Sequence, residues 1–373
     1  MRALCSGTMR RIDLAWLDRA FELAEKGRYG VAPNPMVGAV LVRGGRVVGE
    51  GWHVRAGSPH AEAVALGRAG PAARGADLYL TLEPCVHLGR TPPCAPRVVA
   101  AGVRRVIVAA TDPNPIISGR GLRALRRAGV HVVLAPEQWR RRAAEQNAIF
   151  RAAVVRRRPF VLAKWAASLD GRIADERGES RWITGEAARR RALLLREEYD
   201  AVLVGAGTVA ADDPRLTRRL RLAKGRPHWR IVLDGRARVS PAARVWKAPG
   251  ERVLVTAVRP GASTGRRFKR LGVRVWTLRD RRGQVDLRRL LSELGRHGVS
   301  SLLVEGGAET LGSFFAAGLV DRVAAFVAPR ILGGAAAPAA VGGPGFALLR
   351  TPRLSGVRVE RVGGDLLVTG RVD

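Results

Sequence analysis

Cysteine, aromatic residues and long apolar runs are all scarce in this chain of 373 residues. Three cysteines are too few for the disulfide framework that holds small secreted domains together. Aromatic residues make up 5%, which argues against the stacking platforms of a single-stranded nucleic-acid binder. No apolar run reaches the ~18 residues of a membrane-spanning helix, and none precedes Arg10 and Arg11 as a signal peptide would. We therefore expect a cytoplasmic protein with no membrane partner.

Acidic residues are also scarce relative to basic ones. The chain has 65 lysines and arginines but 32 aspartates and glutamates, which gives a formal charge of +33. Such a balance favours attraction to nucleic acid or to phosphorylated small molecules. The arginines are spread through every segment, so we interpret them mainly as solvated surface that includes some phosphate-binding side chains. With 47% hydrophobic residues, a chain of this length is expected to form two globular domains.

The first part of the chain alternates between helix and strand patterns. Apolar residues recur at three- and four-residue intervals over 13–27, which predicts an amphipathic helix. A hairpin is expected over 39–53 with Gly44 and Gly45 at its turn. Further helices are expected from Ser58 onward and at 94–101 and 121–128, with strands at 78–82 and 103–110. The stretch 139–158 is expected to hold a closing helix followed by a basic linker. This alternation predicts a three-layer α/β domain over 10–150.

A second α/β pattern begins at about Pro159, after the basic run Arg156-Arg157-Arg158. Strands are expected at 160–165, 201–204, 229–233, 253–255, 273–276, 301–304 and 323–328, and helices at 186–198, 287–297 and 308–317. The stretch 333–345 is rich in small residues and is predicted to be a surface loop. We assign the second domain to 159–373.

One histidine and two cysteines between 60 and 94 form a pattern typical of a zinc site. Cys85 follows an apolar strand, and eight residues containing a glycine and two prolines separate it from Cys94. Together with His60, the two cysteines can supply three zinc ligands and leave the fourth position for water, as catalytic sites require. Glu62 stands two residues after His60, where it can move a proton from that water to a leaving amine. Zinc nucleobase deaminases use this arrangement.

Three other interpretations remain open at this point. A closed structural zinc site would use the same ligand types. A zinc-dependent tRNA or nucleobase deaminase would account for the zinc pattern and the positive charge, but it would leave the second α/β domain unused. A basic, non-catalytic RNA-binding protein would need aromatic-rich strands or a recognisable RNA module, and the sequence contains neither.

Further motifs resemble the bifunctional deaminase/reductase family of riboflavin biosynthesis, in which the long spacing between the cysteines is the normal form. The motifs are His60-Ala61-Glu62, Glu83-Pro84-Cys85, Thr91-Pro92-Pro93-Cys94, Asp112-Pro113-Asn114-Pro115, Ser180-Arg181-Trp182, Gly205-Ala206-Gly207-Thr208 and Val304-Glu305-Gly306-Gly307. The resemblance implies a cytidine-deaminase-like first domain. It also implies an α/β second domain similar in fold to dihydrofolate reductase.

This resemblance also implies two successive reactions on 2,5-diamino-6-ribosylamino-4(3H)-pyrimidinone 5′-phosphate. Zinc-dependent deamination would release ammonia, and NADPH would then reduce the ribosyl group to give 5-amino-6-ribitylamino-uracil 5′-phosphate. The expected partner is therefore a phosphorylated pyrimidine and not a specific nucleic acid. The family further implies homo-oligomers formed through the reductase domain.

The resemblance assigns roles to individual residues as well. It places Asn34, His53, His87 and Arg90 around the pyrimidine or its phosphate, and Ser180, Arg196, Leu216, Arg219 and Glu305 around the substrate of the reductase. The implied NADPH contacts are Ala166, Trp182, Thr208, Asp212, Gly235, Gly307, Ala308, Glu309, Thr310, Leu311, Gly312 and Ser313. The glycine-rich turns 205–207 and 306–307 can expose backbone N–H groups to a pyrophosphate. The hydride itself belongs to the cofactor, so we assign no acid to that step.

Overall fold

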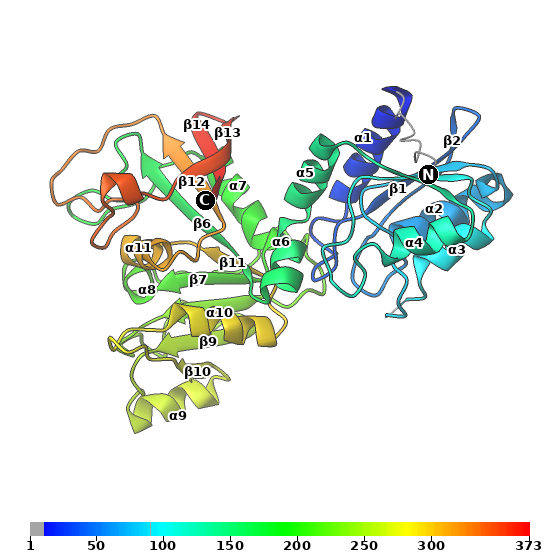
Figure 1. Cartoon of the computed structure of the whole chain (residues 1–373). Helices are drawn as coiled ribbons and strands as arrows, with labels where there is room; N and C mark the ends of the chain where they lie inside the picture. Colours follow the sequence, from blue (N-terminus) through cyan, green and yellow to red (C-terminus); the bar gives the residue numbers. More distant parts are fainter. Residues whose placement is uncertain (1–10, 90) are drawn as a thin grey trace. The chain divides into compact units, whose positions relative to one another are not determined.

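The computed structural model describes residues 11–89 and 91–373 (Figure 1). The chain divides into two compact units, the first ending at Arg157 and the second spanning Arg158–Asp373. The first unit contains helices α1 (Arg11–Glu25), α2 (Ala61–Ala69), α3 (Cys94–Ala100), α4 (Arg120–Arg127), α5 (Glu137–Gln146) and α6 (Ala148–Arg151), and strands β1 (Gly38–Arg43), β2 (Arg46–Trp52), β3 (Asp77–Leu80), β4 (Arg105–Val108) and β5 (His131–Leu134).

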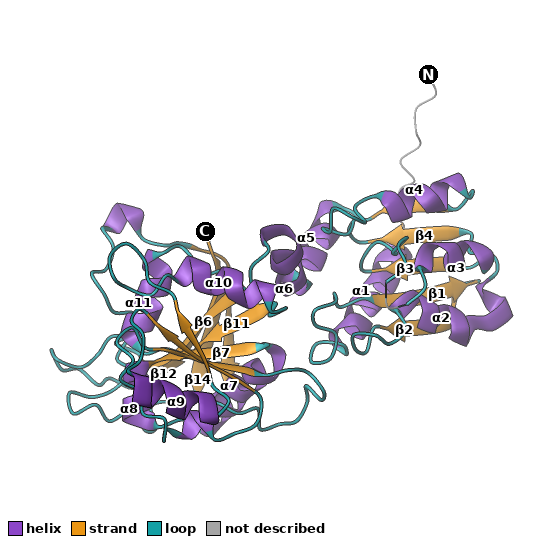
Figure 2. Ribbon diagram, turned by 90° about the horizontal axis from the view of Figure 1, so that it is seen from below, coloured by secondary structure: helices purple, strands orange, loops and turns teal. Residues whose placement is uncertain are grey.

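The sheet of the first unit has the order β2-β1-β3-β4-β5. Strand β1 runs antiparallel to both of its neighbours, whereas β3, β4 and β5 are parallel. Apolar residues of α2, α3 and α4 pack with one face of this sheet, and those of α1 and α5 pack with the other (Figures 1 and 2). The first unit is therefore a three-layer α/β structure, as predicted. In open α/β sheets, sites form beyond the carboxyl ends of the parallel strands, here β3, β4 and β5.

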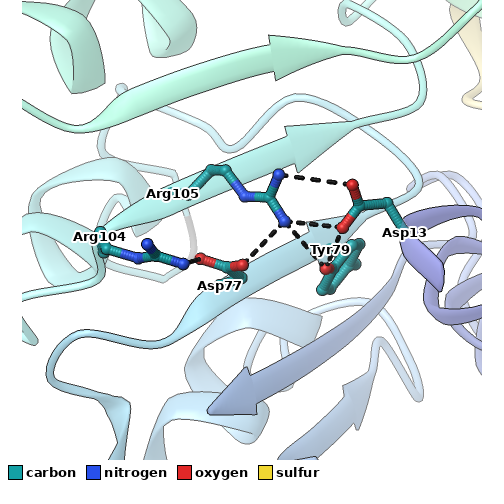
Figure 3. A network of polar contacts seen from close by, with 5 residues as sticks. All are labelled: Asp13, Asp77, Tyr79, Arg104 and Arg105. Atoms are coloured by element: carbon teal, nitrogen blue, oxygen red, sulfur yellow. Dashed lines mark hydrogen bonds and ion pairs between the residues drawn. The ribbon is translucent and has the colours of Figure 1, made fainter. Parts of the chain in front are cut away.

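A buried polar network ties α1 to the middle of this sheet (Figure 3). The guanidinium group of Arg105 donates to Asp13 at 2.7 Å and to Asp77 at 2.8 Å. Tyr79 donates its hydroxyl to Asp13 at 2.7 Å. The side chain of Asp13 is 0% exposed, and that of Arg105 is 14% exposed. Two buried carboxylates therefore depend on one buried cation, and breaking such a group is costly.

The closing helix expected within 139–158 is not one continuous helix. In the structure this segment is divided into α5, α6 and a π-helical turn over Ala152–Arg156. The division between α5 and α6 falls at Asn147, whose side chain accepts from Met36 N at 2.7 Å and donates to Met36 O at 3.0 Å. These bonds satisfy the polar groups of a loop 111 residues away in the sequence, and helical periodicity gives no signal of them.

The second unit contains a larger sheet. Its strands are β6 (Phe160–Ser168), β7 (Ala201–Gly205), β8 (Trp229–Leu233), β9 (Glu251–Thr256), β10 (Arg274–Thr277), β11 (Ser301–Val304), β12 (Arg322–Ala328), β13 (Leu354–Val362) and β14 (Asp365–Val372), and its helices are α7 (Glu186–Glu198), α8 (Ala206–Asp212), α9 (Ala262–Arg270), α10 (Leu287–Arg296) and α11 (Ala308–Ala316). The strand order is β10-β9-β8-β7-β11-β6-β12-β14-β13. All pairs are parallel except β12–β14 and β13–β14.

Apolar residues of α10 and α11 form the main core of this unit with one face of the sheet. On α9, Phe268 packs edge-to-face against Trp246, with ring centroids 5.6 Å apart. The strands expected between 160 and 328 are present, but the sequence patterns did not predict β5, α9, β13 and β14. Within 11–89 and 91–373, none of the helices combines the length and the hydropathy needed to cross a bilayer.

Candidate active sites

The first unit brings one histidine and two cysteines together from three separate elements. His60 lies immediately before α2, Cys85 follows β3, and Cys94 is the first residue of α3. The Nδ1 atom of His60 lies 3.6 Å from the sulfur of Cys85 and 3.4 Å from that of Cys94. All three donor atoms lie within 4.8 Å of one another.

The donor set fits a zinc ion. Zn–S bonds of about 2.3 Å and Zn–N bonds of about 2.0–2.1 Å in a tetrahedron place sulfur and nitrogen roughly 3.6 Å apart. The observed separations of 3.4 and 3.6 Å agree with this value. Hydrogen bonding with Cys94 lowers the pKa of the Cys85 thiol to about 4, against the opposing effect of burial. Three protein ligands of this kind leave one position of the tetrahedron free, as in catalytic sites.

The other ring nitrogen of His60 is also held in place. Its Nε2 atom lies 3.2 Å from Oγ1 of Thr91. With Nδ1 directed at the sulfurs, the Nε2–H group donates to this hydroxyl and fixes the ring orientation, as partners of metal-binding histidines do. No feature of the sequence indicates this role for Thr91, although the residue belongs to the motif Thr91-Pro92-Pro93-Cys94.

Glu62 occupies the first turn of α2 and is 3% exposed. Burial raises the pKa of this carboxyl group to about 7. A carboxyl group that titrates near neutrality can both accept and return a proton under working conditions. The position beside the cluster and the pKa together equip Glu62 for proton transfer.

Two of the residues expected around the pyrimidine lie beside this cluster. The ring centroids of His53 and His60 are 5.1 Å apart. His53 donates from Nδ1 to Pro59 O at 3.2 Å, so its Nε2 atom accepts from Asn34 Nδ2 at 3.0 Å. Burial lowers the pKa of His53, which keeps the ring neutral. His87 is exposed on the loop between the cysteines, and Arg90 lies outside the described residues.

In the second unit, three charged residues meet at Glu305, which directly follows β11. Glu305 pairs through both carboxylate oxygens with Arg196 of α7, at 2.5 and 2.9 Å. Lys164 of β6 lies 3.7 Å from the same carboxylate. Burial alone would raise the pKa of Glu305, but the two cations lower it to about 2. Arg196 thus donates to Glu305 from Nε and Nη2. Fewer of its N–H groups remain to bind a substrate phosphate.

Two glycine-rich turns lie side by side in this unit. Gly307 N donates to Oγ1 of Thr208 at 2.7 Å, and Gly205 N donates to Gly306 O at 3.2 Å. A Cβ atom on Gly205 would lie 2.3 Å from Oγ1 of Thr310, so the turn requires glycine. The structure thus joins the starts of α8 and α11, where backbone N–H groups are free of intrahelical partners.

The remaining residues predicted for the reductase occupy the strands and connections of the same unit. Arg181 donates to Asp212 at 3.2 Å, and Trp182 is 63% exposed with the Arg189 guanidinium 4.5 Å from its ring centroid. Leu216 accepts from His228 through its carbonyl at 2.8 Å. The others are Ala166 on β6, Ser180 before α7, Arg219 before β8, Gly235 after β8, and Ala308, Glu309, Leu311, Gly312 and Ser313 on α11.

Comparison with known proteins gives a family for each unit. Residues 10–110 match the cytidine and deoxycytidylate deaminase zinc-binding region, and residues 159–368 match the RibD C-terminal domain. The riboflavin biosynthesis protein RibD of Aquifex aeolicus is 39% identical over 96% of this chain and 98% of its own length. The RibD protein of Escherichia coli is 41% identical over 86% and 89%.

Solved structures agree with these sequence relatives. Acinetobacter baumannii RibD superposes with a TM-score of 0.84 at 36% identity, covering 97% of this chain and 99% of that chain. A diaminohydroxyphosphoribosylaminopyrimidine deaminase/5-amino-6-(5-phosphoribosylamino)uracil reductase from Thermotoga maritima gives 0.84 at 34% identity, with the same coverage.

Fold and site therefore define an enzyme with a zinc-binding, cytidine-deaminase-like unit followed by a reductase unit. This confirms the predicted fold class. The chain belongs to the RibD family of riboflavin biosynthesis.

Proposed function

We propose that this chain first deaminates 2,5-diamino-6-ribosylamino-4(3H)-pyrimidinone 5′-phosphate and then reduces its ribosyl group with NADPH. The observation that carries the proposal is the cluster of His60, Cys85 and Cys94 with the buried Glu62 beside it, in a chain that continues into a RibD reductase unit. The names of full-length relatives, deaminase and reductase, support the same pair of reactions.

In the deaminase unit, His60, Cys85 and Cys94 would hold a zinc ion, which would supply the Lewis acidity that makes water reactive near neutral pH. Glu62 takes a proton from the attacking water and returns it to the departing amine, for which a pKa of about 7 is suited. The neutral ring of His53, held by Asn34 and Pro59, positions the pyrimidine. We place His87 and Arg90 at its phosphate, because both belong to the loop between the cysteines.

In the reductase unit, NADPH supplies the hydride and the protein binds and orients the two reactants. The paired turns at Gly205–Thr208 and Gly306–Gly307 offer backbone N–H groups to the pyrophosphate of the cofactor. We assign Ala166, Trp182, Asp212, Gly235 and the first residues of α11 to the same cofactor. Glu305, Arg196, Arg219, Ser180 and Leu216 are assigned to the sugar phosphate, with Arg219 exposed and therefore accessible to phosphate.

The test is a two-channel assay on full-length protein with the diaminopyrimidinone ribosyl phosphate, in which ammonia release and NADPH oxidation are recorded together. We expect ammonia without NADPH, and NADPH oxidation matched to ammonia when the cofactor is added. Ammonia release alone would contradict the reductase assignment. The absence of both signals from protein shown to contain zinc would contradict the proposal as a whole.

We further propose that the protein forms homo-oligomers through its reductase unit and works in the cytoplasm. Strand β13 is the last in its sheet and exposes Val357 and Val359, which are 50% and 63% accessible. Unpaired edge strands with exposed apolar residues favour association with a second chain. Reduced thiols, NADPH and sugar phosphates all belong to a reducing compartment. Light scattering on the full chain tests the oligomer, and a monomer would contradict it.

A further inference from the structure

Glu83 lies between β3 and Cys85, and it is a buried acid with an unusual set of partners. Its carboxylate is 4% exposed and accepts four backbone N–H groups. Oε2 accepts from Asp112 at 3.1 Å and from Gly119 at 2.8 Å. Oε1 accepts from Gly121 at 2.8 Å and from Leu122 at 3.2 Å. A carboxylate that replaces its water shell with four N–H donors holds those donors firmly, because charge-assisted hydrogen bonds are strong.

The four donors enclose one segment of the chain, which we call the 112–122 segment. It includes the loop that follows β4 and the first residues of α4. Gly119, the N-cap of α4, has no side chain to cap the helix, so the carboxylate of Glu83 takes that role. Gly121 packs so closely that a Cβ atom there would lie 2.1 Å from Pro84 O. The segment is therefore fixed against the residues that lead directly to Cys85.

The 112–122 segment covers the two sulfur ligands. Ile117, near its middle, is 5% exposed and packs with Cys85 and Cys94 in one buried apolar cluster. Its neighbour Ile116 is 60% exposed. Ile117 is held in turn by backbone bonds to Asn114 O at 2.9 Å and from Arg120 N at 2.7 Å. An apolar shell around metal ligands limits the access of water and of competing ligands.

We infer that Glu83 is a positioning residue of the metal site: it fixes the 112–122 segment, and Ile117 of that segment seals the sulfurs of Cys85 and Cys94. Glu83 touches neither the substrate nor the reacting atoms. Its contribution is to slow the loss of zinc. The inference rests on the proposed zinc site and adds to it a means of retaining the metal.

The test compares zinc-loaded, full-length variants for the rate of zinc release to excess chelator. Glu83→Gln keeps the shape of the side chain but removes its charge and half of its accepting capacity. Ile117→Ala removes the cover alone, and Ile116→Ala is the matched control on the exposed neighbour. We expect release about 10-fold faster or more for Glu83→Gln and Ile117→Ala, the range found for outer-shell partners of metal ligands. Ile116→Ala and the conservative Ile117→Val should stay within about twofold of the wild type.

Amide hydrogen exchange distinguishes the hydrogen bonding of the 112–122 segment by Glu83 from the packing of Ile117 against the sulfurs. Glu83→Gln should speed exchange over 112–122, whereas Ile117→Ala should leave Gly121 and Leu122 protected while zinc still escapes faster. If Glu83 acts through Ile117, the double variant should release zinc about as fast as the faster single variant. Intact NADPH oxidation on deaminated substrate verifies that each chain is folded in its second unit. If Glu83→Gln does not fold, the Ile117 variants still test whether the packing of Ile117 against the sulfurs slows zinc release.

Three results would overturn the inference. One is faster amide exchange in Glu83→Gln with an unchanged rate of zinc release. Another is equal zinc release from Ile117→Ala and Ile116→Ala. The third is a wild-type protein that binds no zinc, which would remove the metal assignment as well. Zinc binding without ammonia release, by contrast, would contradict the proposed deaminase reaction and leave the role of Glu83 intact.

Discussion

The two units build their sites from different parts of the chain. In the first unit the reactive groups are side chains located after a strand and at the starts of two helices. In the second unit the predicted site consists of backbone turns and a buried ion cluster. The first unit places His60, Cys85 and Cys94 within bonding range of one ion. The second joins Gly307 N to Thr208 and pairs Glu305 with two cations. The difference follows from the chemistry: a zinc ion needs protein ligands at set distances, but a diffusible cofactor brings its own reactive atom.

Each unit also contains a buried ion cluster, and the two clusters differ in composition. In the first, the buried Arg105 pairs with both Asp13 and Asp77, and the exposed Arg104 also pairs with Asp77 (Figure 3). In the second, one carboxylate serves Arg196 and Lys164. The residue at the centre is Arg105 in the first cluster and Glu305 in the second. Substitutions at these centres therefore distinguish what each unit needs for stability from what it needs for chemistry.

The largest expected effect is on the chemistry of the first unit alone. Glu62→Gln keeps the shape of the side chain but cannot carry a proton, so ammonia release should fall about 10²–10⁴-fold. Zinc content, measured by atomic absorption, and NADPH oxidation on the deaminated substrate should be unchanged. Glu137→Gln, on the half-exposed acid of α5, is the control and should retain full ammonia release. Loss of zinc or of both activities in Glu62→Gln would contradict the separation of roles.

The next effect is on the stability of the first unit. Arg105→Met leaves the carboxylate of Asp13, which is 0% exposed, without its buried cation and should cost about 3–5 kcal/mol. The urea concentration at which ammonia release is lost should fall accordingly. The matched control is Arg104→Met, because Arg104 is 67% exposed and also binds Asp77. It should cost about 1 kcal/mol or less, and equal losses for both variants would contradict the importance of burial.

A pH dependence is expected in the second unit. Burial alone would raise the pKa of Glu305, but Arg196 and Lys164 lower it to about 2, from a reference value of 4.5. The unfolded state therefore binds the proton more readily, so the contribution of Glu305 is complete above pH ~4.5 and is lost as the pH falls toward ~2. It amounts to about 3 kcal/mol.

Urea unfolding of the wild type and of Glu305→Gln, measured from pH ~6 to pH ~3, checks this expectation. The difference in unfolding free energy should shrink as the pH falls, because protonated Glu305 resembles glutamine. Glu251→Gln, at a partly exposed acid of β9, should differ little from the wild type at any of these values. A gap between the wild type and Glu305→Gln that stays constant with pH would contradict the assignment.

The smallest expected effect concerns the orientation of His60. Thr91→Val keeps the volume of the side chain but removes the hydroxyl 3.2 Å from His60 Nε2. Zinc affinity, from competition with a chromogenic chelator, should fall about 10-fold. The control is Thr111→Val, at an exposed threonine of the same unit, which should bind zinc as the wild type does. Equal affinities for the two variants would show that Thr91 does not orient the ligand.

The predictability of the fold varied with how much of each element is buried on one face. Helix 13–27 and the hairpin with Gly44 and Gly45 at its turn were found close to their predicted positions. Helix α9 was not predicted, because Phe268 is its one buried residue and the helix therefore lacks the repeated apolar positions seen over 13–27. Strand β13 is exposed at nearly every position, so its sequence lacks the alternation of a half-buried strand.

For the sites, the sequence by itself determined which residue types could bind zinc and move a proton, because His60, Glu62, Cys85 and Cys94 have spacings tied to that chemistry. The tertiary structure alone decided which residues support them. The bonds of Thr91 to His60, of Glu83 to the 112–122 segment and of Arg105 to Asp13 join residues 29 to 92 positions apart. Such pairs meet only once the order of the strands and the packing of the helices are set, and no local pattern of residues encodes that order.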